Sequence, residues 1–224
     1  EQIALLHLAV HLDTLAELDP CAATELGIKG ADRDYDADIT DYSPDGVQAR
    51  AAAARSTLRE LDDVSPVDDV DAVTVAALRE RLGVTVELHK AGLDLGELNV
   101  IASPLQAMRD VFDLMATDTD DDWRLISRRL GTVPERVTGY ADALRAAVAG
   151  PHPPAIRQVT RGIEQAEQIQ QLFIDMVTDA VSTNPTLHDE LARHAAGAAA
   201  AYRELGAVLR DDIAPRARQH DACG

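Results

Sequence analysis

The chain has 224 residues, of which 46% are hydrophobic and 27% charged, a composition that excludes disordered and collagen-like proteins. Its 21 Lys and Arg residues against 39 Asp and Glu residues give a formal net charge of −18, which repels nucleic-acid phosphates and anionic lipid headgroups. We therefore expect no nucleic-acid partner and no membrane partner, and no apolar run reaches the roughly 18 residues that span a bilayer.

A first helix is predicted over 2–18, where apolar residues recur at helical spacing. The chain begins at Glu1 without an initiator Met or a basic leader, and one interpretation is that a piece is missing upstream. His7 and His11 have the spacing of a zinc-binding pair, but Leu8 stands where a zinc-peptidase motif has Glu. We interpret both histidines as ordinary half-buried residues.

A small polar residue followed by Pro marks several helix starts, because the polar residue caps the first turn and Pro fits the first helical position. These pairs are Ser43-Pro44, Ser65-Pro66, Ser103-Pro104 and Asn184-Pro185. Thr119, which precedes three Asp residues, and Thr132, which precedes Val133-Pro134-Glu135, mark two more. Together with the apolar spacing, these marks predict helices over 44–62, 67–90, 104–116, 119–131 and 134–149.

The last third of the chain has the most regular helical pattern. Apolar residues step by three and four over 156–181 and again over 187–209, which predicts a long antiparallel hairpin joined at Asn184-Pro185. Only Val84-Thr85-Val86 and Asn99-Val100-Ile101 resemble strands, and each is too short to build a sheet. We therefore predict an all-α fold, an elongated antiparallel bundle of about eight or nine helices.

Three stretches are predicted to be non-helical: 27–42, 92–103 and the Pro-rich 150–154. A stiff Pro-rich segment cannot continue a helix, so a hinge at 150–154 would divide the chain into 1–149 and 155–224. Two helices on their own would leave their apolar stripes without a partner, which favours a single helical domain over 1–224.

Motifs for well-known chemistry are absent from the sequence, which has no Gly-x-Ser-x-Gly nucleophile motif and no phosphate-binding loop. Cys21 and Cys223 are too few for a disulfide scaffold and wrongly spaced for a metal or redox motif. We expect reduced thiols, in keeping with a cytoplasmic location, with a disulfide joining the two ends as the alternative. Asn99 leads into a capped helix, where its amide either receives a ligand or holds the turn, and the turn is favoured.

Several short segments occur together in a characteristic order. They are Leu18-Asp19-Pro20, Asp41-Tyr42-Ser43-Pro44-Asp45-Gly46, Leu98-Asn99-Val100, Val111-Phe112-Asp113-Leu114-Met115 and Arg157-Gln158-Val159. In this order and spacing the chain resembles the N-terminal half of the bacterial domain of unknown function 885 family. Further matching residues continue to Gly224, so the resemblance covers nearly the whole chain.

Members of that family are predominantly helical and look like zinc metallopeptidases of the gluzincin kind. The resemblance implies that their His-Glu-x-x-His helix, third acidic ligand and catalytic base lie in the C-terminal half of such proteins. This chain has no His followed by Glu. No catalytic residue and no metal ligand is therefore assigned here, and zinc is expected only in that missing half. The candidate substrate-binding residues are Tyr42, Asn99, Arg157 and Gln158.

Two functions follow from this resemblance and from the helical pattern. In the first, the chain is the N-terminal, non-catalytic half of a zinc-dependent peptidase-like protein and forms one wall of a peptide-binding cleft. Its acidic surface would favour peptides with basic or free amino groups. In the alternative, the chain is a stand-alone helical binding or assembly module without enzymatic activity. The expected partners are a C-terminal catalytic half of the same protein or a second copy, and a peptide substrate.

Overall fold

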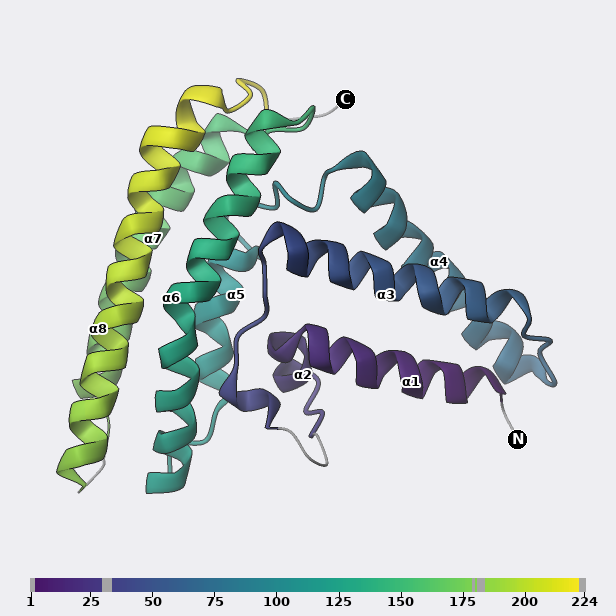
Figure 1. Cartoon of the computed structure of the whole chain (residues 1–224), viewed down its shortest axis with the longest axis horizontal. Helices are drawn as coiled ribbons and strands as arrows, with labels where there is room; N and C mark the ends of the chain where they lie inside the picture. Colours follow the sequence, from purple (N-terminus) through teal and green to yellow (C-terminus); the bar gives the residue numbers. More distant parts are fainter. Residues whose placement is uncertain (1–2, 30–33, 179, 181–183, 222–224) are drawn as a thin grey trace.

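The computed structural model describes residues 3–29, 34–178, 180 and 184–221, with side chains described from Leu8 onward. These residues form eight α-helices and a few single turns of 3-10 or π-helix, and they contain no strand beyond an isolated bridge between Ala155 and Arg218 (Figure 1). The prediction of an all-α fold is confirmed. In the part of the chain that is described, no helix combines the length and apolar character needed to cross a bilayer.

Three long helices form the larger layer of the molecule. They are α6 (Asp120–Ala149), α7 (Ile156–Thr178) and α8 (Pro185–Val208), and α8 packs along both of the others. The predicted antiparallel pairing of the last two is confirmed, although residues 179 and 181–183 lie outside the described part (Figure 1). Their core includes an aromatic row in which Phe173 lies 5.8 Å from Phe112 and 5.4 Å from Tyr202, measured between ring centroids.

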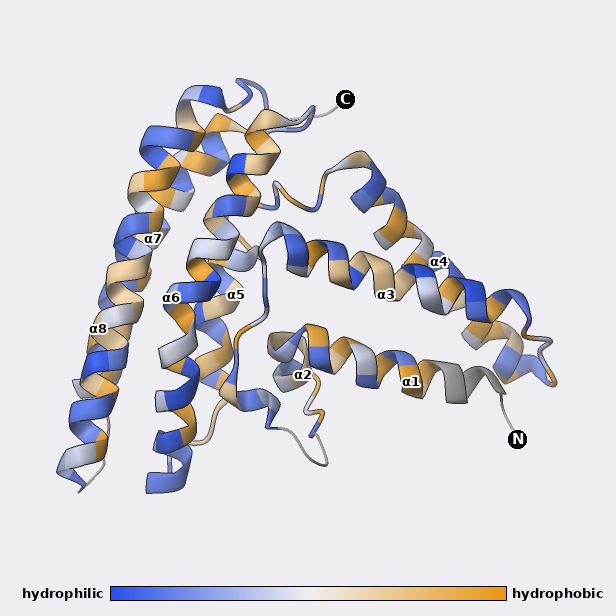
Figure 2. Cartoon of the chain, viewed as in Figure 1, coloured by the Kyte–Doolittle hydropathy of each residue, from blue (hydrophilic) through white to orange (hydrophobic). Residues whose placement is uncertain are grey.

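A second cluster consists of α1 (Ile3–Leu18), α3 (Pro44–Asp62) and α4 (Asp69–Ala91), whose axes run across those of the larger layer (Figure 1). This cluster has an apolar core of its own, made of Ala54, Leu61, Val64, Val75, Leu78, Leu82 and Val86. In Figure 2 hydrophobic and hydrophilic residues alternate along these helices, as expected for helices that bury one face. The short helices α2 (Pro20–Glu25) and α5 (Pro104–Asp110) lie between the two groups.

A buried arginine fastens the segment around α2 to the larger layer. Arg129 of α6 is fully buried, and its Nε donates to the carbonyl of Asp38 at 2.8 Å. Its Nη2 donates to Thr24 Oγ1 at 2.8 Å and to the carbonyl of Tyr35 at 3.2 Å. Its Nη1 is buried without a hydrogen-bond partner among the described residues. Burying a guanidinium is costly, and the bonds of Nε and Nη2 offset part of that cost while they hold the chain before Tyr42 against α6.

Most of the predicted helix starts are confirmed by the observed caps. Ser43 Oγ accepts from the Gly46 amide at 3.2 Å, and Ser103 forms a capping box with Gln106. Thr119 caps α6, and Asn184 caps α8. Each cap depends on residues within three positions, which is why the sequence alone was enough to locate it.

Two predicted boundaries are wrong. The second cluster's α4 begins at Asp69 with Asp68 as its N-cap, instead of at Ser65-Pro66, because Asp68 Oδ1 accepts from the Asp71 amide at 2.8 Å. The predicted helix over 104–116 ends as an α-helix at Asp110 and continues as the 3-10 turn Val111–Leu114.

The predicted break between 131 and 134 is also wrong, because α6 runs unbroken from Asp120 to Ala149 with Pro134 inside it. Thr132 Oγ1 donates to the Arg129 carbonyl at 2.9 Å instead of capping a new helix. The ring of Pro134 lies near Gly197 of α8, where an added Cβ would meet a ring carbon at 3.7 Å, an ordinary contact distance. The helix therefore continues through a residue that removes one of its backbone hydrogen bonds.

The two strand-like segments do not form strands. Val84, Thr85 and Val86 lie inside α4, where Thr85 Oγ1 donates to the Arg81 carbonyl at 3.2 Å. Residues 99–101 form a turn before α5. At the Pro-rich stretch, the Arg218 amide donates to the Pro154 carbonyl at 3.1 Å, which ties 150–154 to the end of the described chain. The hinge proposed there, and the single domain over 1–224, stay predictions.

Candidate functional site

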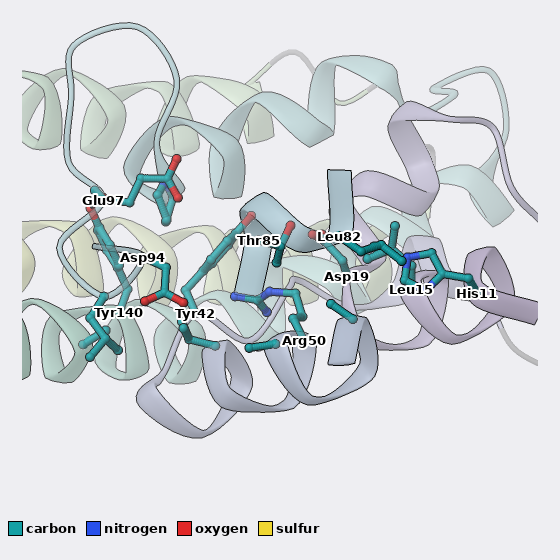
Figure 3. A pocket seen from close by; sticks show the side chains of 16 residues that line it. His11, Leu15, Asp19, Tyr42, Arg50, Leu82, Thr85, Asp94, Glu97 and Tyr140 are labelled. Atoms are coloured by element: carbon teal, nitrogen blue, oxygen red, sulfur yellow. Dashed lines mark hydrogen bonds between the residues drawn. The ribbon is translucent and has the colours of Figure 1, made fainter. Parts of the chain in front are cut away.

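A cavity of about 300 Å³ lies where the second cluster meets α6. We call it the Tyr42 cavity; it is lined by His11, Leu15, Asp19, Tyr42, Val47, Arg50, Ala51, Ala54, Leu82, Thr85, Asp94, Leu95, Glu97, Pro104, Tyr140 and Ala143. Figure 3 shows Asp94, Glu97, Tyr42 and Tyr140 toward one end, His11 and Leu15 at the other, and Arg50 between them. The cavity is therefore a slot with a polar end and a more apolar end.

Tyr42 forms one wall of this slot. Its ring meets that of Tyr140 edge-on at 6.4 Å, and the Arg50 guanidinium lies 5.3 Å from its centroid. Burial, together with the nearby Cys21 and Asp19, raises the pKa of Tyr42, so its hydroxyl stays protonated at neutral pH. This side chain offers a rigid aromatic surface and a neutral hydroxyl.

Arg50 supplies the positive charge nearest the middle of the slot. Its Nη1 donates to the Asp41 carbonyl at 2.6 Å, which directs the guanidinium over the Tyr42 ring. Among the described residues, no carboxylate lies within ion-pair distance of Arg50. This placement depends on Gly46: a Cβ added there would lie 2.1 Å from the Asp41 carbonyl oxygen, so only glycine allows α3 to approach that carbonyl.

Three carboxylates line the cavity. Asp19 Oδ1 accepts from the Ala22 amide at 3.0 Å and from Thr40 Oγ1 at 2.5 Å. Asp94 Oδ2 lies 2.7 Å from His89 Nδ1, whereas Asp94 Oδ1 is buried without a hydrogen-bond partner. Loss of water on burial raises the pKa of Glu97. The negative charges of Asp94 and Asp19 raise it further, whereas the positive charge of Arg50 lowers it.

His11 lies toward the apolar end of the slot and is 8% exposed. Its Nδ1 lies 3.0 Å from Thr57 Oγ1, and the Thr57 hydroxyl donates to the Ala53 carbonyl at 3.2 Å. Because that hydroxyl has one proton, His11 Nδ1 is the donor in their bond and Nε2 keeps a lone pair. Burial, opposed by Glu60, lowers the pKa of His11, so the ring is neutral at pH 7.

A second hollow of about 350 Å³ lies beside the slot. The two hollows share four lining residues, Asp19, Tyr42, Glu97 and Pro104. The second hollow is lined further by Glu25, Asp110 and Ile101, and Ile101 is 84% exposed. The two hollows therefore adjoin at Tyr42, and we call the pair the elongated depression.

Only Tyr42, of the four candidate substrate-binding residues, lines the cavity. Asn99 Oδ1 accepts from the amides of Ile101 and Ala102 at 2.8 Å each, which is the turn-holding arrangement that the sequence favoured. Arg157 and Gln158 line a separate hollow on α7. Gln158 Oε1 is buried without a partner, and Arg157 Nη1 lies 3.3 Å from Asp221 Oδ2. Substrate contact by any of the four stays a prediction.

The sequence analysis missed Arg50, Asp94 and Glu97. Asp94 and Glu97 lie within the stretch over 92–103, which is predicted to be non-helical. Acidic residues in a loop before a capped helix were a usable signal for a binding site, because binding residues often lie on loops. Arg50 gave no such signal, because its role depends on a backbone carbonyl and an aromatic ring brought near it by the fold.

A serine, a glutamate and a histidine meet between α6 and α8. The hydroxyl of Ser127 donates to Glu190 Oε1 at 2.8 Å, and His194 Nδ1 lies 2.8 Å from the Ser127 carbonyl. Ser127 Oγ also lies 3.0 Å from His194 Nδ1, but Nδ1 donates to the Ser127 carbonyl and therefore cannot take a proton from the hydroxyl. A nucleophilic serine must donate to its histidine and reach the substrate, whereas Ser127 is fully buried. These three residues link two helices and are not a catalytic site.

Metal and thiol chemistry were tested against the described residues. They contain no group of three or more His, Cys, Asp or Glu side chains that would hold a metal ion, so they do not fit a zinc site. The His7 side chain and Cys223 lie outside the described part, so neither the histidine pair nor a disulfide between the two ends is tested. Cys21 is buried, and burial raises the pKa of its thiol.

A groove of about 710 Å³ lies on the outer face of α7 and α8, away from the Tyr42 cavity. Its floor is a row of alanines from α8, and its rim includes Ile174, Val177 and His188. The Ile174 side chain is 45% exposed and Leu172, two residues earlier, is 40% exposed. Part of the apolar stripe on these helices is therefore uncovered in this chain.

Comparison with known proteins adds a family and a fold. The sequence matches the family described as "Bacterial protein of unknown function (DUF885)" over residues 20–224. The crystal structure of a "putative lipoprotein" from Colwellia psychrerythraea has a similar fold, with a TM-score of 0.69 and 18% sequence identity. That match covers 97% of this chain and 42% of the other, so the chain spans less than half of that protein's length. No curated protein matches the sequence.

Proposed function

The chain belongs to the bacterial protein family of unknown function DUF885, and we propose that it forms the non-catalytic helical wall of a peptide-binding cleft in a zinc-dependent, peptidase-like protein. The observation that carries the cleft is the elongated depression formed by the Tyr42 cavity and the second hollow. The link to zinc peptidases has the sequence resemblance as its support. In this proposal the zinc ligands lie in a C-terminal half, as the sequence resemblance implies, and the residues described here contain no group of three or more side chains that would hold a metal ion.

The shape and lining of the depression suit an extended chain. Binding sites are concave, largely apolar and provided with a few fixed polar groups, and the Tyr42 cavity has this composition. Tyr42 and Tyr140 provide flat apolar surfaces, Arg50 and the carboxylates provide polar contacts, and the second hollow extends the path past Tyr42. A peptide would lie across the line where the second cluster meets the larger layer.

The groove on α7 and α8 supplies the contact for the rest of such a protein. In our proposal the C-terminal half of a longer chain covers the alanine row and the exposed Ile174. This assignment fits the solved structure of similar fold, which is more than twice as long as the part that matches. Burial of exposed apolar side chains would favour that contact.

Photo-crosslinking of a peptide to the purified chain tests the cleft. We expect a tetrapeptide carrying benzoylphenylalanine to cross-link within 42–54 and 94–104, the segments that contribute most of the lining. Thr85→Trp should block this cross-linking, because Thr85 is exposed and lines the cavity. The matched control is Val84→Trp on the same helix, at a residue that is exposed but does not line the cavity. Cross-links scattered over the surface, or equal effects of the two variants, would contradict the proposal.

A further inference from the structure

We propose that the Tyr42 cavity binds the alkylammonium group of a peptide, either its free amino terminus or a lysine side chain. This inference rests on the peptide-binding role proposed above and adds the chemistry of the group that enters the slot. It is carried by four features of the cavity: unused acceptors, an excess of negative charge, a small volume and an apolar wall.

Hydrogen-bond acceptors outnumber the donors available inside the slot. Asp94 Oδ1 is buried and has no hydrogen-bond partner, which is costly for a carboxylate oxygen unless a ligand supplies a donor. His11 is more than nine-tenths buried, and its Nε2 lone pair has no hydrogen-bond partner among the described residues. Both atoms accept and neither donates, and they lie toward opposite ends of the slot. An ammonium group at the polar end would donate to Asp94, whereas the His11 Nε2 atom is an acceptor toward the other end.

The charge of the lining points to a cation. Asp19, Asp94 and Glu97 face the slot with three carboxylates, against the single guanidinium of Arg50. Arg50 is held by the Asp41 carbonyl and the Tyr42 ring and forms no ion pair with these acids among the described residues. Loss of water is the main cause of the raised pKa of Glu97, and the neighbouring Asp94 and Asp19 add to it against Arg50. A positive group placed between these carboxylates would relieve their repulsion.

The size of the cavity limits what enters it. A volume of about 300 Å³ is at the lower end of the range of small-molecule sites, which leaves room for one end group or one side chain. Leu15, Ala54 and Leu82 line the cavity as well, and their apolar surface suits the methylene stem of a lysine. The remainder of the peptide would lie in the second hollow, which shares Tyr42 and Glu97 with the slot.

Calorimetric titration of the purified chain with three tetrapeptide amides tests the inference. The first is Ala-Ala-Ala-Ala with a free amino terminus, the second is N-acetylated Ala-Lys-Ala-Ala, and the third is N-acetylated Ala-Met-Ala-Ala, which is neutral. We expect at least one of the charged peptides to bind about tenfold or more tightly than the neutral one. The first two peptides separate the amino terminus from the lysine side chain as the source of the ammonium group.

Variants of the chain then locate the site. Glu97→Gln and Asp94→Asn should each weaken binding of the charged peptide about tenfold and leave the neutral peptide unaffected. Glu97 is the cleaner test, because no hydrogen bond or ion pair of its carboxylate is observed among the described residues. The control is Glu167→Gln on α7, an exposed glutamate outside both hollows that pairs with Arg210. It should leave all affinities unchanged.

The outcomes distinguish this inference from the peptide-binding role. If charged and neutral peptides bind with equal affinity, and Thr85→Trp abolishes the binding of both, the charge selection is overturned and the cleft is left in place. Binding of n-butylammonium that is lost in Glu97→Gln, with no binding of any peptide, would support the cation site and overturn the peptide cleft. Charged-peptide binding that survives both carboxylate substitutions would overturn the site assigned here, and absence of all binding would overturn both proposals.

Discussion

The hydroxyl of Tyr140 donates a 2.7 Å hydrogen bond to the backbone carbonyl of Glu97. Tyr140 is among the most deeply buried side chains of α6, whereas Glu97 belongs to the connection between α4 and α5. This bond fixes the loop to the larger layer, and the same loop places the Glu97 carboxylate at the cavity. The position of the Glu97 side chain therefore depends on the core of α6 as much as on its own loop.

Replacement of this hydroxyl should weaken both the fold and the site. We expect Tyr140→Phe to lower the free energy of unfolding by about 1–2 kcal/mol, because the Glu97 carbonyl loses its donor. Tyr202→Phe is the matched control, since Tyr202 donates a similar 2.8 Å bond to the Leu105 carbonyl away from the cavity. Urea titration should show comparable losses for both variants, whereas n-butylammonium affinity should fall only for Tyr140→Phe. Equal affinities in the two variants would contradict the role given to this bond.

The Glu97 carboxylate should reduce stability at neutral pH. Its folded pKa lies above the ordinary value of 4.5, first because of lost hydration, so the folded state holds the proton more tightly than the unfolded state. This contribution to stability is full below pH 4.5 and is lost as the pH rises through the folded pKa. Glu97→Gln should therefore raise the urea midpoint at pH 7 and have little effect near pH 3.5. A variant that is less stable at pH 7 would refute this assignment.

The buried His11 should make the fold sensitive to mild acid. Burial lowers its folded pKa below 6.5, so the unfolded state takes up the proton first as the pH falls. The stability present above pH 6.5 is therefore lost as the pH drops through the folded pKa. We expect His11→Gln to reduce the slope of unfolding free energy against pH between 7 and 5. An unchanged slope would show that His11 titrates alike in the folded and unfolded chains.

Removal of the Arg129 guanidinium should release the segment before Tyr42. Arg129→Met leaves the carbonyls of Asp38 and Tyr35 buried without their donor, and we expect a loss of about 3 kcal/mol. Limited proteolysis should then cut within 20–41 while α6, α7 and α8 stay protected. The neighbouring exposed Arg128 pairs with Asp34, and Arg128→Met should cost less than about 1 kcal/mol. Equal protease resistance of the two variants would argue against the anchoring role.

A methyl group at Gly46 should displace the Asp41 carbonyl that holds Arg50 in the cavity. Gly46→Ala places a carbon 2.1 Å from the Asp41 carbonyl, which also accepts from Arg50, so we expect a loss of about 2 kcal/mol or more. Gly83→Ala in α4 meets open space and should instead stabilise the protein by about 1 kcal/mol. Thermal unfolding of the two variants should shift in opposite directions. If Gly46→Ala leaves the thermal unfolding unchanged, Asp41 can move aside without loss of stability, and the prediction is wrong.

The helix starts could be predicted because their physics is local. Ser43, Ser103, Thr119 and Asn184 cap helices through bonds that reach at most three residues along the chain. The place of Pro134 inside α6 could not be predicted, because Thr132 and Pro134 have the pattern of a helix start, whereas Thr132 Oγ1 donates back to the Arg129 carbonyl of the same helix. The start of α4 was predicted at Ser65 instead of Asp68 because both are suitable N-cap residues and lie three positions apart. The sequence alone does not show which of the two caps the helix.

The site was harder to predict than the fold. Tyr42 was selected from a matching segment of sequence, and it lines both hollows. Arg50, Asp94 and Glu97 meet only when α3, the loop after α4 and α6 come together, and nothing in their spacing announces this. Arg157 and Gln158 stand out in sequence to the same degree as Tyr42, but the fold carries them to another face of the molecule.

The second cluster keeps its apolar core separate from that of α6, α7 and α8, and the Tyr42 cavity lies along the seam between them. Because each core is packed by its own helices, a substitution at this seam changes the shape of the slot at less cost than one inside either core.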